Sequence, residues 1–235
     1  MRTGAEIMRD AGILLNDEKH TRWSLPELCG WINEASRAIV LGKPSAKTHT
    51  RTLQLEAGTK QNVAAVSGLP TPIALVEVVR NVAGPAEPLV GGRTVRATSR
   101  TILDAQDPYW HVADRVPFRK EVRHIVYEEQ LPLEFYVYPG NDGTGFVEAI
   151  VSHVPAALVA TGADDALTSY AAEIDLAEPY SVPILDYVLF RCQSKDDTAA
   201  MPGRASVHYQ AFASAIGLKI QVEGASSTNS RRSGP

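Results

Sequence analysis

The chain has 235 residues, with 23 Lys and Arg against 27 Asp and Glu, a formal net charge of −4. This negative balance gives no long-range attraction toward nucleic acid or an anionic membrane. Hydrophobic residues make up 44% of the chain, enough for one large or two small domains, whereas two cysteines are too few for a disulfide framework.

The first 45 residues predict two amphipathic helices, with no signal-peptide core and no apolar run that could span a bilayer. The first helix is expected over residues 4–15. The second is expected to begin at Ser24, which forms a capping box with Glu27 and places Pro26 in the tolerant first turn. Its inward stripe comprises Leu25, Leu28, Ile32, Ala35 and Ile39. This three- and four-residue spacing predicts one buried helix face.

From Thr48 the hydrophobic period changes to two, which predicts strands. Strands are expected over residues 48–55, 73–82, 122–128, 134–138 and 146–154, with turns at 57–59 and 139–145. The third and fourth of these strands are expected to pair antiparallel. Residues 83–98 have no period and predict a long loop, followed by a short helix over 99–106. Short strands joined by turns predict a small sandwich or open barrel.

The chain becomes helical again near Tyr180, with two further amphipathic helices separated at Met201-Pro202-Gly203. Residues 218–222 alternate as an edge strand does, and residues 224–235 have a composition typical of disorder. The predicted fold is α+β: a helical bundle from the N- and C-terminal helices with an inserted antiparallel β-rich module. The expected domains are 1–45 with 178–218 for the bundle, 46–177 for the insertion and 219–235 for the tail.

No catalytic, cofactor-binding or metal-binding constellation stands out. None of the six histidines forms a ligand pair of the HExxH kind, and the cysteines are far apart in the sequence. Adjacent carboxylates such as Asp164-Asp165 point apart along the chain, unlike the facing pair of a glycosidase. The glycine-rich run 140–145 lacks the following helix of a phosphate loop. We therefore expect no enzyme activity and no cofactor.

Aromatic and arginine side chains in irregular segments are the best candidates for contacts with partners, because Tyr, Trp and Arg are enriched at interfaces. The interface candidates are Arg93, Arg96, Arg100, Tyr109, Trp110, His111, Arg231 and Arg232. For Trp110 a place in a satellite core is an open alternative. For Arg231 and Arg232 the alternative is a role in solubility alone.

Three stretches, taken in order, resemble the head-to-tail adaptor (connector) proteins of tailed bacteriophages, particularly those of short-tailed phages. The first runs from Leu14-Leu15-Asn16-Asp17 through Thr21-Arg22-Trp23-Ser24 to Trp31-Ile32-Asn33-Glu34-Ala35. The second contains Val78-Val79-Arg80-Asn81, Leu103-Asp104-Ala105-Gln106-Asp107-Pro108-Tyr109-Trp110-His111 and Phe135-Tyr136-Val137-Tyr138-Pro139. The third contains Leu185-Asp186-Tyr187-Val188-Leu189-Phe190-Arg191 and His208-Tyr209-Gln210-Ala211-Phe212.

The resemblance implies a structural virion protein at the head–tail junction, assembled in the cytoplasm of the bacterial host. It implies a homo-oligomeric ring, commonly of twelve copies, under the portal protein, which extends the DNA channel and provides a docking platform for tail or nozzle proteins. Double-stranded DNA would pass through without specific binding, and no membrane would be involved. Two alternatives remain: a tail-associated carbohydrate-binding or hydrolytic module, and a nucleic-acid-binding regulator, which the net charge disfavours.

Overall fold

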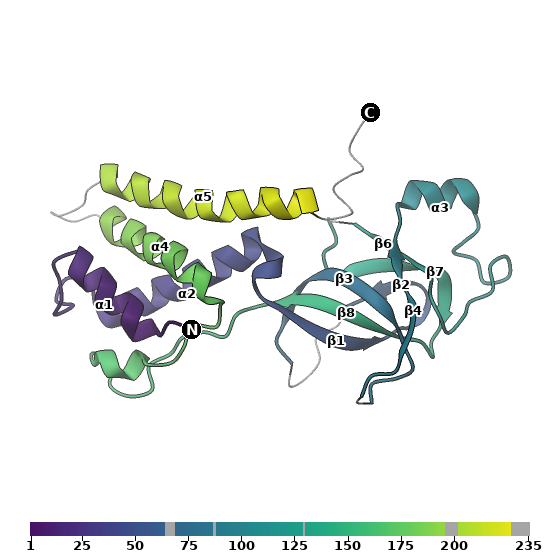
Figure 1. Ribbon diagram of the computed structural model, residues 1–235, viewed down its shortest axis with the longest axis horizontal. Coiled ribbons are helices and arrows are strands. Elements are labelled where there is room, and N and C mark those ends of the chain that lie inside the picture. Colours follow the sequence, from purple (N-terminus) through teal and green to yellow (C-terminus); the bar gives the residue numbers. More distant parts are fainter. Residues whose placement is uncertain (64–68, 87, 129, 196–201, 227–235) are drawn as a thin grey trace. The chain divides into compact units, whose positions relative to one another are not determined.

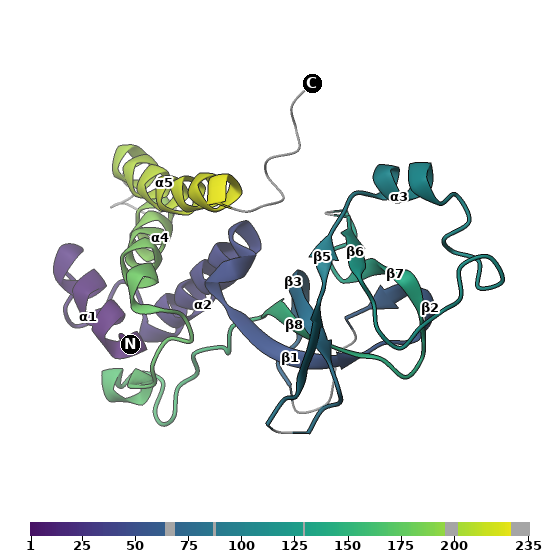
Figure 2. The same cartoon turned by 45° about the vertical axis from the view of Figure 1, so that its right-hand side comes forward.

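The computed structural model describes residues 1–63, 69–86, 88–128, 130–195 and 202–226, with only the backbone given for residue 202 and residues 218–226. The chain divides into two compact units (Figures 1 and 2). A helical unit comprises Met1–Lys47 and Pro155–Pro235, and a β unit comprises Thr48–Val154. The predicted α+β class is confirmed, because helices from both ends of the chain flank a β-rich middle.

The helical unit is built from α1 (Gly4–Leu14), α2 (Leu25–Gly42), α4 (Ser181–Ser194) and α5 (Pro202–Ser226). Helix α4 packs against the other three, and α5 lies alongside it (Figure 1). Short 3₁₀ turns lie at Pro44–Ala46, Leu167–Tyr170 and Glu178–Tyr180. The most completely buried side chains of these helices include Ile7, Met8, Leu28, Ile32, Ile39, Ile184 and Val188. The predicted inward stripe of residues 24–42 is therefore confirmed.

Both N-terminal helices begin with a capping box. At α2 the backbone N–H of Ser24 donates to the Glu27 carboxylate at 3.3 Å, which confirms the sequence prediction. At α1 the Thr3 N–H donates to the Glu6 carboxylate at 2.8 Å, and the Glu6 N–H donates to the Thr3 hydroxyl at 3.2 Å. Each box satisfies amide groups that the first turn of a helix leaves without partners.

Residues 155–177 were predicted within the β insertion, but they pack against the helices. The Asn33 side chain holds this segment: its Nδ2 donates to the Leu158 carbonyl at 2.9 Å and its Oδ1 accepts from the Leu158 N–H at 2.8 Å. The Gly4 N–H donates to the Ala172 carbonyl and the Ile174 N–H to the Arg2 carbonyl, each at 3.0 Å. The prediction was wrong because the segment has no period, so composition could not reveal which unit buries its apolar side chains.

The predicted edge strand at residues 218–222 is also wrong, because α5 continues through these residues to Ser226. A five-residue alternation is too short to distinguish a strand from a helix. No proline interrupts the helix between Gly203 and Ser226, and each residue added to an existing helix gains a backbone hydrogen bond. The rest of the predicted tail, 227–235, lies outside the described residues.

The β unit contains two four-stranded sheets, with strand orders β1-β8-β3-β4 and β2-β7-β6-β5. The strands are β1 (Thr48–Gln54), β2 (Ala57–Asn62), β3 (Pro72–Val82), β4 (Gly91–Thr94), β5 (Arg96–Ala97), β6 (His124–Tyr127), β7 (Glu134–Asp142) and β8 (Phe146–His153). The predicted β6–β7 pair is confirmed as antiparallel, with His124 opposite Tyr138. Helix α3 (Arg100–Gln106) matches the predicted short helix.

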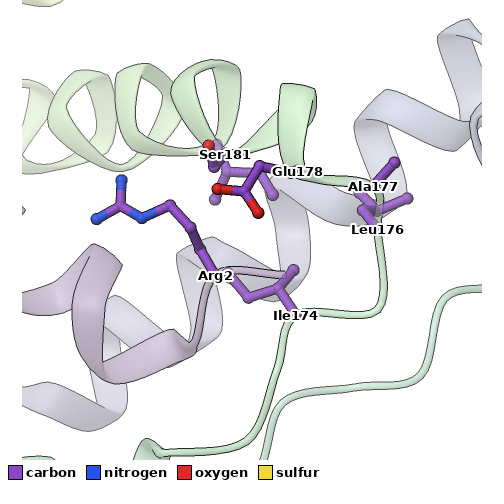
Figure 3. A pocket seen from close by; sticks show the side chains of 7 residues that line it. Arg2, Ile174, Leu176, Ala177, Glu178 and Ser181 are labelled. Atoms are coloured by element: carbon purple, nitrogen blue, oxygen red, sulfur yellow. The ribbon is translucent and has the colours of Figure 1, made fainter.

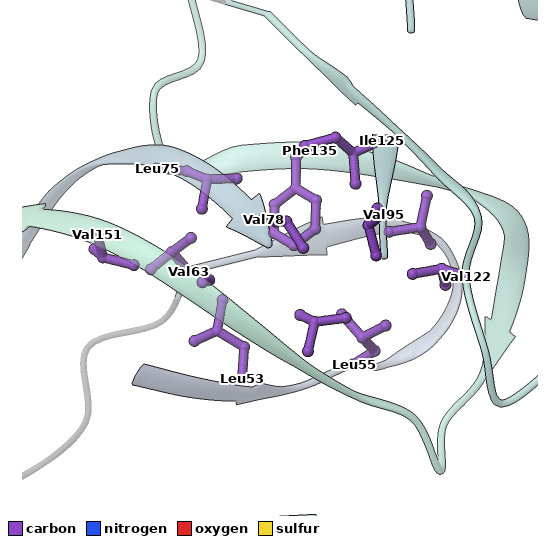
Figure 4. Close-up of a cluster of buried hydrophobic side chains, with 13 residues drawn as sticks. Leu53, Leu55, Val63, Leu75, Val78, Val95, Val122, Ile125, Phe135 and Val151 are labelled. Atoms are coloured by element: carbon purple, nitrogen blue, oxygen red, sulfur yellow. The ribbon is translucent and has the colours of Figure 1, made fainter. Parts of the chain in front are cut away.

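The core of the β unit lies between the inner faces of these sheets (Figure 4). Its buried members are Leu53, Leu55, Val63, Leu75, Val78, Val95, Val122, Ile125, Phe135, Val137, Val147, Ala149 and Val151. Several side chains alternate along their strands, as Phe135 and Val137 do on β7, which is the pattern of a half-buried strand. The strands thus form a sandwich, the first of the two predicted architectures.

Several details of the β unit differ from the prediction, among them strand β7, which continues to Asp142 into the predicted turn 139–145. Residues 57–59 begin strand β2 instead of forming a turn, and Gly58 has a φ of 124° that L side chains rarely adopt. The aperiodic stretch 83–98 contains the short strands β4 and β5. Strand β5 pairs with β6 in parallel, so that sheet is mixed. Two- and four-residue strands are too short to produce a readable period.

Candidate partner-binding surfaces

A second, smaller core covers the outer face of the sheet β2-β7-β6-β5. Along β7 the side chains of Tyr136 and Tyr138 point away from the main core and pack against this second cluster. Its buried members are Leu103, Trp110 and Val126. Helix α3 supplies Leu103, and the loop after α3 supplies Trp110. The loop that follows α3 is therefore anchored on the sheet.

Trp110 is the anchor of this loop, with an exposed fraction of 0%. Its indole Nε1–H donates to the Asp104 carboxylate at 2.8 Å, and its ring lies 3.6 Å from the His111 ring, centroid to centroid. His111 Nδ1 in turn lies 2.7 Å from the Thr59 hydroxyl. Burial, with nearby Arg100, lowers the pKa of His111, so its ring is neutral at pH 7.

The structure therefore places Trp110 in a satellite core, the alternative that the sequence left open, and its indole is not exposed to a partner. The neighbouring Tyr109 differs, because 60% of its surface is exposed. The Arg115 guanidinium lies over the Tyr109 ring, 5.6 Å from its centroid. Val112 on the same loop is also exposed. An exposed aromatic–arginine pair on an anchored loop has the composition of an interface hot spot.

Arg100 is exposed, but it is engaged within the chain. Its guanidinium lies 3.2 Å from the Glu128 carboxylate and 3.7 Å from that of Asp104. It also lies over the Tyr136 ring, at 5.8 Å from the centroid. A partner that took this arginine would have to replace those contacts, so Arg100 is the weaker of the arginine candidates.

Arg93 and Arg96 lie at an exposed edge that also carries three cations missed in the sequence interpretation. The Arg96 N–H donates to the Arg123 carbonyl at 3.1 Å, which joins the stretch 91–97 to the stretch 119–123 at this point. We call the exposed cations of these two stretches the basic strip: Arg93, Arg96, Arg119, Lys120 and Arg123. The run Arg119-Lys120-Glu121-Val122-Arg123 was the missed signal, because sequence alone did not place it next to Arg93.

Two buried asparagines fix the backbone of the basic strip. The Asn81 amide donates to the carbonyls of Arg93 and Val122, at 2.9 and 2.8 Å, and its oxygen accepts from the Val122 N–H at 2.9 Å. The Asn141 amide donates to the carbonyls of Arg119 and Lys120, at 3.0 and 2.8 Å. Fully satisfied buried amides of this kind hold a backbone in one arrangement.

His124 reports the positive field of the strip. Burial lowers the pKa of its imidazole, and the charges of Arg93, Arg96 and Arg123 lower it further. A hydrogen bond with the Arg96 backbone raises the pKa, but by less than the other effects lower it. The pKa of a histidine falls when like charges surround it. The ring is therefore neutral at pH 7, and the arginines supply the charge at this edge.

Arg231 and Arg232, the last two interface candidates, lie outside the described residues.

In the helical unit, one buried carboxylate organises the α1–α2 loop. Asp17 accepts hydrogen bonds from the backbone N–H groups of Thr21, Arg22 and Trp23, each at 3.0 Å, and from the Thr21 hydroxyl at 2.8 Å. The Trp23 indole N–H then donates to the Cys192 carbonyl on α4 at 3.3 Å. The first stretch of the adaptor resemblance, which contains Asp17 and Trp23, thus joins the α1–α2 loop to the bundle.

Two hollows in the described part of the helical unit lack the facing carboxylates of a hydrolytic site. One, with a volume of about 10 Å³, lies between Arg2, Ile174 and Glu178 (Figure 3), roughly the space of one water molecule. The other, about 420 Å³, is lined by Lys19, His20, Asp164 and Asp165 among others. These two carboxylates come from the same turn.

Within the described ranges, no group of three or more His, Cys, Asp or Glu could hold a metal ion. Over the same ranges, no helix is both long enough and apolar enough to cross a membrane.

Burial raises the pKa of the Cys192 thiol to about 12, and it also raises that of Cys29. Both thiols are therefore protonated at neutral pH and poor nucleophiles.

A comparison with family models finds a match to the SU10 adaptor protein model over residues 2–234. The chain belongs to the SU10 adaptor protein family. This match confirms the resemblance to bacteriophage adaptor proteins and identifies the chain as a phage structural adaptor protein. A search of curated proteins found no match. The motifs that carried the resemblance have structural roles here: Asp17, Asn81 and Trp110 each fix a loop.

Proposed function

We propose that this SU10 adaptor protein forms a homo-oligomeric ring beneath the portal protein, with twelve copies as the expected number. The ring extends the DNA channel and presents a platform for tail or nozzle proteins. The protein would then be a virion component of the head–tail junction, assembled in the host cytoplasm. The family match over residues 2–234 is the observation that carries this proposal.

The two-unit organisation supports a platform role. Both ends of the chain enter the helical unit, so the β unit is a single insertion that leaves at Lys47 and returns at Pro155. Its exposed loops are anchored by their own small core, and they carry Tyr109 and Arg115 at the surface. Pre-organised loops lose little conformational entropy on docking, which favours binding.

Quantitative mass spectrometry of purified virions tests the proposal directly. About equal numbers of this chain and of the portal protein would support a ring matched to the portal. Absence from particles would reject the adaptor role and favour an enzyme or regulator. Purified rings should not retain duplex DNA at physiological salt, because the chain's negative balance opposes phosphate binding.

Two variants separate the proposed contacts. Deletion of residues 227–235 leaves the described part of α5 intact and should weaken attachment to portal rings if the tail docks there. Tyr109→Ala with Arg115→Ala should instead weaken the binding of tail proteins. Val76→Ala is the matched control, since Val76 is an exposed apolar side chain elsewhere on the β unit, with 41% of its surface exposed. Equal binding by the double variant and the control would reject the Tyr109 surface.

A further inference from the structure

Charge is strongly segregated along the chain, although its net value is small. Between Arg123 and Arg191 there is no Lys or Arg, whereas this stretch contains 11 Asp and Glu. The five cations of the basic strip all precede this stretch, between Arg93 and Arg123. Without them the chain carries 18 Lys and Arg against 27 Asp and Glu. The strip is therefore a local positive surface on an otherwise acidic protein.

The cations of the strip are exposed, and no described carboxylate lies within 4 Å of any of them. Asp142 lies farther away, where the charge of Lys120 helps to lower the pKa of its carboxyl group. Other cations of the β unit do have such partners, for example Lys60 with Glu134 at 2.8 Å. Four of the five are arginines, whose planar guanidinium forms paired hydrogen bonds with carboxylates. Because Asn81 and Asn141 fix the backbone beneath them, these cations are presented as a set.

A surface of opposite charge lies on the helical unit, mainly in residues 155–177, which the sequence had assigned to the β insertion. Asp164, Asp165, Glu173 and Glu178 are all exposed, and we call them the acidic segment. Among the described residues, the cation within 4 Å of Glu173 and Glu178 is the N-terminal ammonium, at 3.4 and 3.8 Å. Among the described residues, Asp164 and Asp165 have no cation within 4 Å.

We propose that the basic strip of one copy docks on the acidic segment of the next copy in the ring. Contacts around a ring are heterologous, so each copy must present two different surfaces that complement each other. The strip and the segment meet this requirement with charges of opposite sign. A protein surface is a better partner for the strip than DNA, because the protein's net charge of −4 opposes binding to a long row of phosphates. This inference rests on the ring of the proposed function.

Charge reversal tests the contact, with assembly on co-expressed portal protein as the measurement. The strip variant is Arg96→Glu/Arg123→Glu, and the segment variant is Asp164→Lys/Asp165→Lys. The control Arg9→Glu/Arg37→Glu makes the same charge change as the strip variant, at exposed positions of the helical unit. All four strip and segment positions are exposed, so circular dichroism and melting temperature should match the wild type. Each test variant should give about tenfold fewer multi-copy assemblies, the equivalent of ~1.4 kcal/mol.

Combining the substitutions in one chain, or mixing the two variants, distinguishes a contact between copies from one within a chain. A chain that carries both reversals should assemble, because its two surfaces are again opposite in sign. An equal mixture of the strip and segment variants should also assemble, since each copy then finds complementary neighbours. Recovery in the four-substitution chain but not in the mixture would show a contact within one chain and overturn the proposal.

The remaining outcomes are also decisive. If wild-type protein assembles and both test variants assemble equally well, the contact is rejected while the ring stands. If a 20-base-pair duplex binds the wild type at physiological salt and the strip variant loses only this binding, the strip is a DNA surface. If the wild type shows no multi-copy assembly on portals, the proposed function fails and the contact fails with it.

Discussion

Substitution of Asp17 should destabilise the helical unit far more than its small side chain suggests. Asp17 is 8% exposed, and its two carboxylate oxygens accept three backbone N–H groups and one hydroxyl. Asp17→Asn replaces one oxygen with an NH₂ group, which then faces two donors. Hydrogen bonds to charged groups contribute about 1.5–3 kcal/mol each, so the expected loss is roughly 2–4 kcal/mol.

The same contacts predict how stability depends on pH. Burial would raise the pKa of Asp17, but the hydrogen bonds from Trp23, Thr21 and Arg22 outweigh it, so the pKa lies below the ordinary 3.8. A carboxylate with a lowered pKa in the folded state stabilises the fold above the unfolded-state pKa, and this contribution is lost as pH falls through the folded value. The wild type should therefore lose stability below about pH 5, and Asp17→Asn should lose less.

Urea denaturation followed by circular dichroism at 222 nm measures this effect, because the helical unit holds most of the helix. Glu18→Gln is the matched control: Glu18 is adjacent and exposed, and its substitution should change the free energy of unfolding by less than about 0.5 kcal/mol. An Asp17→Asn variant that is as stable as this control, or equally sensitive to acid as the wild type, would refute the assigned role.

Three further predictions concern the rest of the molecule. Asn81→Ala removes three buried hydrogen bonds and should lower the free energy of unfolding of the β unit by about 2–4 kcal/mol. Asn62→Ala, at an exposed edge, should lower it by less than about 1 kcal/mol in the same thermal denaturation, and equal losses would contradict this. Gly145→Ala places a Cβ 2.3 Å from a backbone carbonyl and should lower the melting temperature, while Gly203→Ala, with nothing within 4 Å, should not. Cys192 has a pKa of about 12, so a thiol reagent at pH 8 should modify it only after unfolding; rapid labelling of the native protein would show that the thiol is accessible.

Local signals in the sequence determined most of the elements. The capping box at Ser24 and Glu27 fixed the start of α2, because its partners are three residues apart and need no tertiary contact. The inward stripe of α2 and the strands β3 and β8 followed from period, since regular geometry puts alternate or every third and fourth residue on one face. The resemblance to phage adaptors likewise rested on short motifs that could be read directly.

Tertiary structure alone decided where irregular segments belong. Leu158 joins the helical unit because Asn33, 125 residues earlier, holds its backbone, and no local pattern encodes that pairing. Trp110 is buried because Tyr136 and Tyr138 face outward on β7 and Asp104 takes its N–H. The basic strip exists because Asn81 joins two stretches that are distant in sequence. Hydrogen bonds and burial between distant residues depend on the whole fold, whereas period and capping depend only on neighbours.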